Sequence, residues 1–465
     1  MIGLHIFTRD HRLYDNTSLI SLLNKCDKII TIFIFTPQQV INNSYKSDKS
    51  IQFMIESLSD LEDSINKNQG ELFCFLDDYE KVIEKIIKNN QINAVSINKD
   101  YTPYAKSREK KINKLCEINN CEFICEYDYL LTEPEEILNG DGYVYKKFTP
   151  FYNNAIKIIK PFSIQDGKFK NKIAEKINKE GIKTVLLRDE FIRLIKPDPN
   201  SKLIGGRDQG LKKLSALKFQ KNYAKKHNCF NYETSLLAAY TKYGCLSIRE
   251  VYNKSSKELG SKGDFIRQLF WRDFYTLLLN QYPHLLGGAL KPKYDKIKWI
   301  NNTTFLNAWK NGRTGFPIVD ANMRALNTEG WMHNRGRLIV ASFLIKTLGI
   351  NWLKGEKYFA TKLIDYDVAV NNGNWQWVAG TGADAQPYFR IFNPWTQGEN
   401  YDPEAIFIKK WIPELDDLEP KIIHNWYKYA NEDEYKEYAK KYGKPIVDYS
   451  DQKEKILKIY KSVFG

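Results

Sequence analysis

The sequence predicts two parts of different fold class, an α/β part with a doubly wound parallel sheet followed by an all-α part. Short apolar runs alternate with amphipathic stretches in the first 130 residues, whereas the apolar spacing of the second half is helical almost throughout. The chain of 465 residues also exceeds what one hydrophobic core usually fills. We therefore expect a parallel-sheet domain over residues 1–130, a polar connector over 131–200 and a helical domain over 201–465.

Five apolar runs are the expected strands of the first part. Helical patterns separate them, and this order builds a parallel sheet with crossover helices. In one such pattern, over residues 50–65, the apolar residues recur on a single helical face. No G-x-G-x-x-G follows the first run, so the usual dinucleotide-binding fingerprint is absent. The expected strands are residues 3–7, 29–35, 72–75, 94–97 and 123–126.

The second part contains clear helix boundaries. Thr234 and Ser235 precede an apolar run, and we expect them to cap a helix. Pro317 opens a helix that Gly330 closes, and a further helix is expected over residues 331–348. All ten tryptophans of the chain lie in this part, together with polar residues at positions where a plain bundle would carry leucine. A polar site inside a helical domain is therefore expected.

Composition excludes several classes of protein. The sequence has no apolar run of 18 residues and no cleavable leader, so we expect a chain that neither crosses a membrane nor is exported, and that works in the cytoplasm, or in the nucleus if eukaryotic. Seven irregularly spaced cysteines predict neither a disulfide framework nor a metal site. The net charge of +14 permits binding to nucleic acid. We expect a monomer.

Two segments combine acids, amides and arginines with indoles. One runs from Asp365 to Trp377 and includes Asn-Asn-Gly-Asn-Trp-Gln-Trp, and the other runs from Trp331 to Arg337. Carboxylates accept hydrogen bonds from ring N–H and sugar hydroxyl groups, arginine binds anions, and tryptophan covers a planar face. For any single residue, helix capping or packing is the simpler interpretation. The density of such residues favours a site for a planar heterocycle that carries phosphates.

These segments resemble the photolyase/cryptochrome family, and the resemblance covers nearly the whole chain. Asn-Asn-Gly-Asn-Trp-Gln-Trp and Arg-Ile-Phe-Asn-Pro are most similar to class I cyclobutane pyrimidine dimer (CPD) photolyases. The resemblance implies an α/β antenna domain, a helical FAD-binding domain, and light-driven splitting of CPDs in UV-damaged DNA by electron transfer from excited reduced FAD. The other matching segments are residues 7–16, 234–237, 271–275, 314–324 and 387–394.

The resemblance assigns FAD contacts to several segments. Thr234, Ser235 and the backbone of Leu237 are expected to bind the diphosphate at a helix start. Asn371 matches the residue that faces flavin N5, where an amide can both donate and accept a hydrogen bond. Arg337 matches a position beside the isoalloxazine ring. The remaining expected FAD-binding residues are Tyr223, Leu236, Phe265, Gln268, Arg272, Asp365 and Asp367.

The resemblance also divides the tryptophans into three groups. Trp375, Trp352 and Trp299 match an electron-transfer chain from the flavin to the surface. Trp271 and Trp377 match the pair that stacks on a dimer flipped out of the duplex. The other five are expected to be packing residues, and they are Trp309, Trp331, Trp395, Trp411 and Trp426.

Catalytic roles beside this lesion pair fall to Gln268, Asn334 and Asn371. Gln268 stands where class I photolyases carry glutamate, and Leu338 where they carry methionine, so hydrogen bonding is kept and the acid is lost. The (6-4) photolyases share this glutamine. Their two histidines correspond to Asn334 and Leu338, neither of which is an acid, so (6-4) repair is disfavoured. The expected DNA-binding residues are Lys226, Trp271, Arg272, Arg335, Leu338 and Trp377.

Other functions remain open at this point. A cryptochrome-type blue-light photoreceptor would use the same flavin and tryptophans without repair, and an FAD-bearing DNA-binding protein would lack photochemistry. The antenna chromophore is also open. Tyr104 and Ala105 replace the Asn-Glu pair that some relatives use for a folate. A deazaflavin, a folate bound in another way, or no chromophore at all agrees with the sequence.

Overall fold

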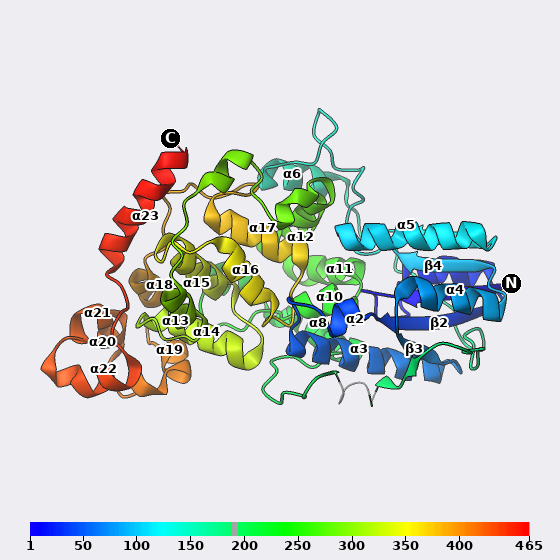
Figure 1. Cartoon of the computed structure of the whole chain (residues 1–465), viewed down its shortest axis with the longest axis horizontal. Helices are drawn as coiled ribbons and strands as arrows, with labels where there is room; N and C mark the ends of the chain where they lie inside the picture. The colour runs from blue at the N-terminus through cyan, green and yellow to red at the C-terminus, as the bar shows by residue number, and fades with distance from the viewer. Residues whose placement is uncertain (188, 190–193, 465) are drawn as a thin grey trace.

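The computed structural model describes residues 1–187, 189 and 194–464, and it contains the two expected classes of structure in the expected order (Figure 1). The α/β part and the helical part lie side by side along the long axis of the molecule. Parts of the expected connector, at residues 188 and 190–193, and the last residue of the expected helical domain lie outside the described residues.

The sheet confirms the five predicted strands, which run parallel to one another. The strand order is β5-β4-β1-β2-β3-β6. A sixth strand that the sequence pattern did not predict, β6 (Thr184–Val185), pairs antiparallel with β3 and is only two residues long. The five parallel strands are β1 (Ile2–Phe7), β2 (Lys28–Phe35), β3 (Leu72–Leu76), β4 (Ala94–Asn98) and β5 (Glu122–Glu126).

The strand order reverses between β1 and β4, and the loops after these two strands open at the same edge of the sheet. This edge faces the helical part, because Arg9, just after β1, forms an ion pair with Asp367. Arg12 of the same loop shares Asp128 with Arg249 of the helical part, at 2.7 and 2.8 Å. The crossover helices are α1 (Thr17–Lys25), α2 (Pro37–Val40), α3 (Asp48–Lys67), α4 (Tyr79–Asn90) and α5 (Pro103–Ile118).

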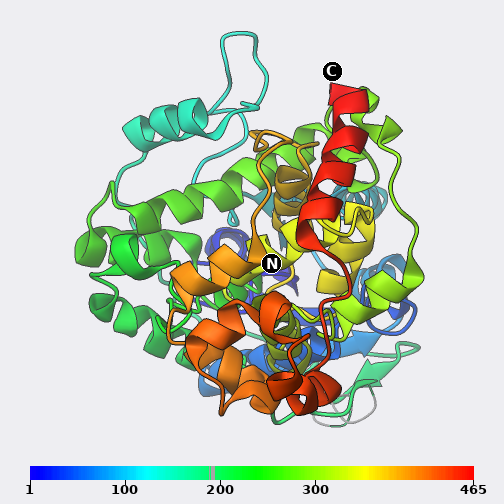
Figure 2. The same cartoon turned by 90° about the vertical axis from the view of Figure 1, so that its left-hand side faces the viewer.

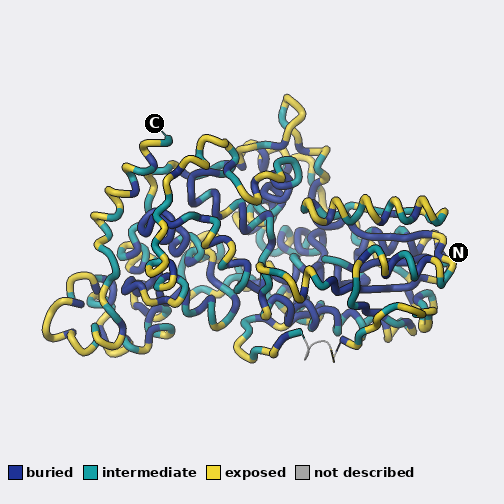
Figure 3. Tube along the Cα trace, in the orientation of Figure 1, coloured by how far each residue is buried: buried dark blue, intermediate teal, exposed yellow. Residues whose placement is uncertain are grey.

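The helical part surrounds a core formed by its central helices α14 to α17, and Figure 2 views this part from its outer end. Dark, buried segments concentrate in these helices and in the sheet, whereas α22 and α23 are exposed over much of their length (Figure 3). The helices outside the sheet domain are α6 (Phe148–Ile158), α8 (Arg207–Ser215), α9 (Tyr223–Lys226), α10 (Ala238–Lys242), α11 (Ile248–Leu259), α12 (Asp264–Gln281), α13 (Thr303–Lys310), α14 (Pro317–Glu329), α15 (Asn334–Lys346), α16 (Trp352–Ala360), α17 (Val368–Ala379), α18 (Pro394–Tyr401), α19 (Ile406–Trp411), α20 (Pro420–His424), α21 (Trp426–Tyr429), α22 (Lys436–Tyr442) and α23 (Tyr449–Phe464).

Two predicted helix starts are wrong and one helix is confirmed. Thr234 and Ser235 cap no helix, because the backbone turns at Leu236 (φ 57°) and α10 begins only at residue 238. The helix expected from residue 331 begins at 334, because His333 accepts a hydrogen bond from the backbone N–H two residues later and so serves as the cap. The helix that Pro317 opens ends before Gly330, as predicted. Within the described part of the chain, no helix is long and apolar enough to span a membrane.

Candidate active site

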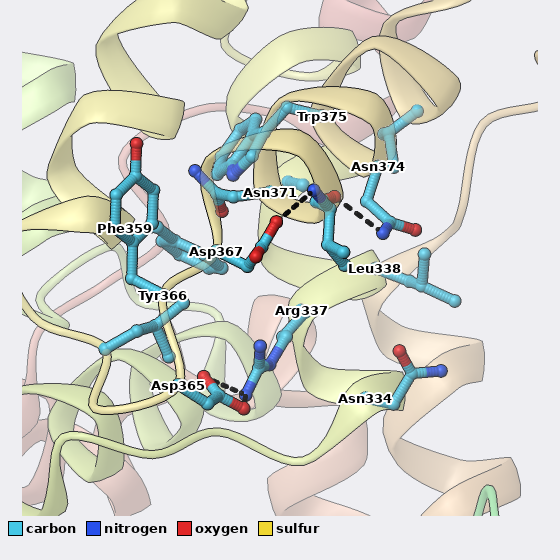
Figure 4. A pocket seen from close by; sticks show the side chains of 14 residues that line it. Asn334, Arg337, Leu338, Phe359, Asp365, Tyr366, Asp367, Asn371, Asn374 and Trp375 are labelled. Atoms are coloured by element: carbon cyan, nitrogen blue, oxygen red, sulfur yellow. Dashed lines mark hydrogen bonds and ion pairs between the residues drawn. The ribbon is translucent and has the colours of Figure 1, made fainter. Parts of the chain in front are cut away.

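The described residues form a cavity between α15, α16, α17 and the loop that precedes α17 (Figure 4). Residues far apart in sequence meet here because these three helices pack against one another. The cavity brings together many of the predicted site residues. Its lining consists of Asn334, Arg337, Leu338, Ala341, Phe359, Leu363, Asp365, Tyr366, Asp367, Val370, Asn371, Asn374, Trp375 and Val378.

Helix α17 contributes two neighbouring stripes of side chains. Successive residues of an α-helix are rotated by about 100°, so residues at spacings of three and four form a stripe. The inner stripe is defined here as residues 371, 375 and 378, and all three are buried. The outer stripe is residues 370, 374 and 377, of which Asn374 is exposed and Trp377 half-buried. The two tryptophans of the Asn-Trp-Gln-Trp motif therefore project on different sides of the helix.

The amide of Asn371 is held in one orientation. Its Nδ2 donates to the Glu356 Oε1 at 2.9 Å and to the Glu356 backbone carbonyl at 3.2 Å. A carbonyl oxygen can only accept, so the nitrogen end of the amide must point toward Glu356. The oxygen end is then available to the cavity, which Asn371 lines (Figure 4).

Charged side chains form the base of the cavity. Arg337 donates to Asp365 at 2.8 Å, and this pair lies opposite Asn371 in Figure 4. Asp367 caps α17 and accepts hydrogen bonds from Arg9 and from the Tyr129 hydroxyl. Burial alone would raise the pKa of Asp367, but the Arg9 guanidinium and these hydrogen bonds hold it well below its ordinary value. Asp367 is therefore a carboxylate near neutral pH.

The loop before α10 offers free backbone donors. No described residue accepts a hydrogen bond from the backbone N–H groups of Thr234, Ser235, Leu236 or Leu237. Since Leu236 adopts a left-handed conformation, these groups do not continue into a regular helix. Adjacent free N–H groups suit a diphosphate. Together with a carboxylate, an arginine and an amide on the cavity, this donor set fits the FAD that the family resemblance implies.

Three predicted electron-transfer tryptophans follow a path of decreasing burial. Trp375 and Trp352 are each 3% exposed, and Trp299 is half-buried. Helix α16 approaches Trp375 so closely that a methyl group at Gly355 would lie 2.2 Å from its ring. Trp352 is one turn earlier on α16, and the backbone beside Trp299 is hydrogen-bonded to the backbone just before α16 at 2.7 Å. The three indoles therefore occupy adjoining segments.

Residues predicted for lesion binding are arranged more loosely. Among the described residues, Gln268, Trp271 and Trp377 do not line the cavity. Gln268 is exposed, and its amide contacts only its own helix, at 3.3 Å. Trp271 has one ring face covered, because Phe148 stacks on it with ring centroids 3.7 Å apart and planes at 5°. Phe274 and Tyr275 of the same helix also contact this ring, at centroid distances of 5.5 and 5.4 Å, so only its half-exposed part is open to a ligand.

The predicted cationic residues lie at different places. Arg335, at the start of α15, stacks over Tyr401 at 4.4 Å and donates to Asn228 at 2.8 Å. Burial lowers the pKa of Arg335. Lys226 is exposed at the end of α9, and Arg272 stacks over Tyr129 at 3.5 Å. Since Tyr129 is bonded to Asp367, Arg272 is linked to the cavity through that ring.

Among the described residues, the predicted FAD contacts Tyr223 and Phe265 do not line the cavity. Tyr223 and Phe265 pack edge to face, with ring centroids 5.3 Å apart. Of the tryptophans expected to be packing residues, Trp309 lies 6.2 Å from Trp375 and donates its indole N–H to the Val340 carbonyl. These residues support the segments that line the cavity.

Sequence patterns missed three residues of the site. Glu356 carries a usable signal, because it lies four residues after Trp352 on the buried face of α16, where an acid is unusual. Arg9 follows the first strand at the point where the strand order reverses, but this order is not visible in one sequence. Tyr129 reaches Asp367 from the segment that follows β5, at the end of the α/β domain, and carries no sequence signal.

Comparisons with known proteins agree with this arrangement. Residues 3–189 match the family model of DNA photolyase, and residues 265–462 match that of the FAD binding domain of DNA photolyase. The chain is 35% identical to the deoxyribodipyrimidine photo-lyase of Buchnera aphidicola subsp. Baizongia pistaciae, over 99% of this chain and 98% of that one.

Solved structures of similar proteins cover the chain from end to end. The archaeal photolyase from Sulfolobus tokodaii, a crystal structure with two FAD molecules, is 39% identical with a TM-score of 0.88 over 100% of both chains. The Synechocystis cryptochrome is 28% identical with a TM-score of 0.89, over 98% of this chain and 99% of that one. The chain therefore belongs to the photolyase/cryptochrome family and carries that family's FAD-binding domain in its helical part.

Proposed function

We propose that the protein is a deoxyribodipyrimidine photo-lyase that uses light to split CPDs in UV-damaged DNA, as a divergent relative of the class I enzymes. The observation that carries the proposal is the arrangement of α17, whose inner stripe is buried at a hydrogen-bonded site while Trp377 of the outer stripe lies half-buried outside the cavity, on another side of the same helix. The full-length similarity to the Buchnera photo-lyase supports it. Catalysis would reside in the helical domain, residues 201–465. The protein would act as a monomer in the cytoplasm, or in the nucleus if it is eukaryotic.

The residues of the cavity would hold and orient FAD. Free N–H groups of residues 234–237 would bind the diphosphate, Arg337 and Asp365 would lie beside the ring system, and Asn371 would present Oδ1 to N5. When bound, reduced and excited by light, FAD supplies one electron to the dimer and takes it back after both ring bonds have broken. The protein contributes position and a fixed electrostatic environment.

The lesion would bind between residues of different helices. Trp271 and Trp377 would replace the stacking that a flipped dimer loses, and Phe148 would hold the Trp271 ring from behind. Gln268 and Asn334 are exposed amides that can donate to and accept from a pyrimidine edge. Arg335, Arg272 and Lys226 would neutralise backbone phosphates.

Trp375, Trp352 and Trp299 would deliver electrons to oxidised FAD. A buried indole that loses an electron keeps its proton, whereas the half-buried Trp299 can release a proton to water. The gradient of burial along the three residues supports electron flow toward the flavin.

Light-dependent repair of defined oligonucleotides tests the proposal. The holoprotein with a reductant is mixed with a single-lesion CPD strand or a (6-4) strand, and pyrimidine absorbance is followed in blue light and in darkness. We expect absorbance to return only for the CPD strand and only in light. Recovery of the (6-4) strand alone would contradict the assignment, because Asn334 and Leu338 supply no acid for that reaction.

A second candidate is a cryptochrome-type photoreceptor without repair. The similarity to the Synechocystis cryptochrome favours it, since the fold and the cofactor site alone do not separate sensing from repair. The same experiment distinguishes the two functions. Normal photoreduction of the flavin with no change in the CPD strand would support sensing.

We also propose that the α/β domain binds an antenna chromophore next to Arg108. Arg108 Nε and Nη2 and the hydroxyl of Tyr79 are buried without a hydrogen-bond partner among the described residues. The Arg108 guanidinium lies 5.3 Å from the Tyr79 ring centroid. Cation and rings together suit a planar acidic molecule such as a deazaflavin or a folate. An Arg108→Met protein should lose any absorption band that FAD does not explain, and an unchanged spectrum would contradict the proposal.

A further inference from the structure

We propose that Glu356, held from the α/β domain by Tyr45, is a positioning residue that fixes which end of the Asn371 amide faces the cavity. Through this amide, protonation of Glu356 is linked to the redox state of the bound flavin. The inference rests on the proposed FAD site, but it is independent of DNA repair.

The contact between Glu356 and Asn371 is buried and directional. Glu356 is 4% exposed, and both its carboxylate and its backbone carbonyl accept from Asn371 Nδ2. As long as the carboxyl group is ionised, it can only accept, so two acceptors hold the nitrogen end of the amide. Once protonated, the carboxyl group becomes a donor and favours the oxygen end instead. Only the backbone carbonyl then opposes a turn of the amide.

The orientation of this amide distinguishes two states of a flavin. A reduced ring carries a hydrogen on N5, which donates, whereas an oxidised ring presents a lone pair there, which accepts. The oxygen end of Asn371 therefore favours reduced FAD, and the nitrogen end favours oxidised FAD. An ionised Glu356 should raise the midpoint potential, and a protonated Glu356 should lower it.

Tyr45 extends this arrangement into the other domain. It is half-buried in the loop between α2 and α3, and its ring lies against α16, 5.3 Å from Lys357 Nζ, which places its hydroxyl to donate toward the Glu356 carboxyl group. The end of this loop and the start of α3 are fixed on the helical part, because Ser47 donates to the Lys362 carbonyl at 3.3 Å and Ser50 to the Ile364 carbonyl at 3.2 Å. The α/β domain thus contacts Glu356, which is linked to the cavity through the side chain of Asn371.

The groups around Glu356 set the pH at which it ionises. Burial raises its pKa, and hydrogen bonds from Asn371 and Tyr45 and the charge of Lys357 on its own helix oppose the rise. Tyr366, from the loop before α17, is close enough to respond to its charge. Removing the Tyr45 hydroxyl should therefore raise the pKa of Glu356 further.

The test is the midpoint potential of FAD in the holoprotein, measured against pH without DNA. We expect the wild-type plot of midpoint potential against pH to change slope at the pKa of Glu356. Below this pH, the potential should be lower than the line through the points near neutral pH predicts. Glu356→Gln should remove the break, and Tyr45→Phe should shift it to higher pH. Tyr358→Phe is the matched control, since this hydroxyl on α16 binds Asn327 at 2.6 Å, and it should leave the break in place.

Each outcome has a clear consequence. A break that persists in Glu356→Gln overturns the proposal, and a break that stays at the same pH in Tyr45→Phe overturns the role of Tyr45. If Glu356→Gln does not retain FAD, Tyr45→Phe decides alone, because it keeps the carboxyl group. A protein that fails to repair DNA but shows the shifts would refute the proposed function and leave this inference standing.

Discussion

The inner and outer stripes of α17 differ in how far the protein itself completes their hydrogen bonding. On the inner stripe, Asn371 is bonded to Glu356 and Trp375 is packed into the core. On the outer stripe, the exposed Asn374 also lines the cavity but bonds only to its own helix, at 2.8 Å, and Trp377 lies outside the cavity. The difference indicates that the cofactor side is formed in advance, whereas the DNA side obtains its contacts from a partner. A site where charge develops during the reaction needs its polar groups fixed before the ligand binds. A surface that binds a large ligand such as DNA needs this less, because side chains there can adjust when the partner binds.

The largest effect should come from breaking the charged base of the cavity. Asp365→Asn leaves the Arg337 charge without its counter-charge at a site where the Asp365 side chain is 5% exposed. Loss of one member of a buried pair costs about 3–5 kcal/mol, and the 28% exposure of Arg337 reduces this to about 2–3 kcal/mol. We expect a lower free energy of unfolding and loss of most FAD, measured by urea titration and flavin absorbance.

A surface pair provides the control for this variant. Glu437→Gln removes the ion pair between Glu437 and Lys440, and the side chains of both residues are more than half exposed. It should change neither stability nor FAD content measurably. If Asp365→Asn behaves like this control, the base of the cavity is not preorganised and the comparison fails.

A slightly smaller effect should appear as a pH dependence at the start of α15. Burial and the nearby Arg337 and Arg335 charges lower the pKa of His333 from 6.5 to about 4. Its neutral form is therefore favoured in the folded state, and the resulting stability is present above about pH 6.5 and lost as the pH falls through 4. His333→Asn keeps a capping oxygen and should flatten this dependence by about 2 kcal/mol.

Urea unfolding of both proteins at pH 7.5 and 4.5, about one unit above and two below the ordinary histidine pKa, measures this difference. Equal slopes of stability against pH in His333→Asn and wild type would show that the histidine is not buried in its neutral form.

On the outer stripe, Trp377→Ala should weaken binding to CPD-containing DNA by about 1–3 kcal/mol, the range for one stacking contact. FAD content should stay unchanged, because this half-buried indole does not belong to the inner stripe. Trp411→Ala, the loss of another half-buried indole, is the control and should leave DNA affinity unchanged. Loss of flavin in Trp377→Ala would remove the distinction between the two stripes.

The smallest effect should follow from a single phosphate contact. Arg335→Gln should reduce the slope of log affinity against log salt by about 1, with similar losses for damaged and undamaged DNA. Filter binding at several salt concentrations measures the slope. A loss confined to damaged DNA would assign Arg335 to the lesion instead.

The sequence predicts the fold well and the site unevenly. Local patterns sufficed for β1 to β5 and for the helix that Pro317 opens, because apolar spacing and terminal residues are local signals. They failed at Thr234 and Ser235, where a left-handed Leu236 delays the helix. The site residues that the sequence did not predict are those that meet only in the folded structure, from positions far apart in the chain.

Residues such as Arg9 and Tyr45 illustrate these gaps. Each reaches the site from the α/β domain across more than 300 positions of sequence, to Asp367 and Glu356 respectively. No periodicity in a single sequence encodes such a pairing. The α/β domain therefore contributes to the cavity in a way that motif matching alone did not predict.

The proposed repair requires that the open side of α17 presents a CPD to a light-driven flavin on the buried side of this helix. Its most direct test is the pyrimidine absorbance of a CPD-containing oligonucleotide mixed with chemically reduced wild-type holoprotein under blue light. We predict a rise in absorbance in light and none in darkness. An unchanged absorbance in light, from a protein that binds the oligonucleotide and keeps its flavin reduced, would contradict the account.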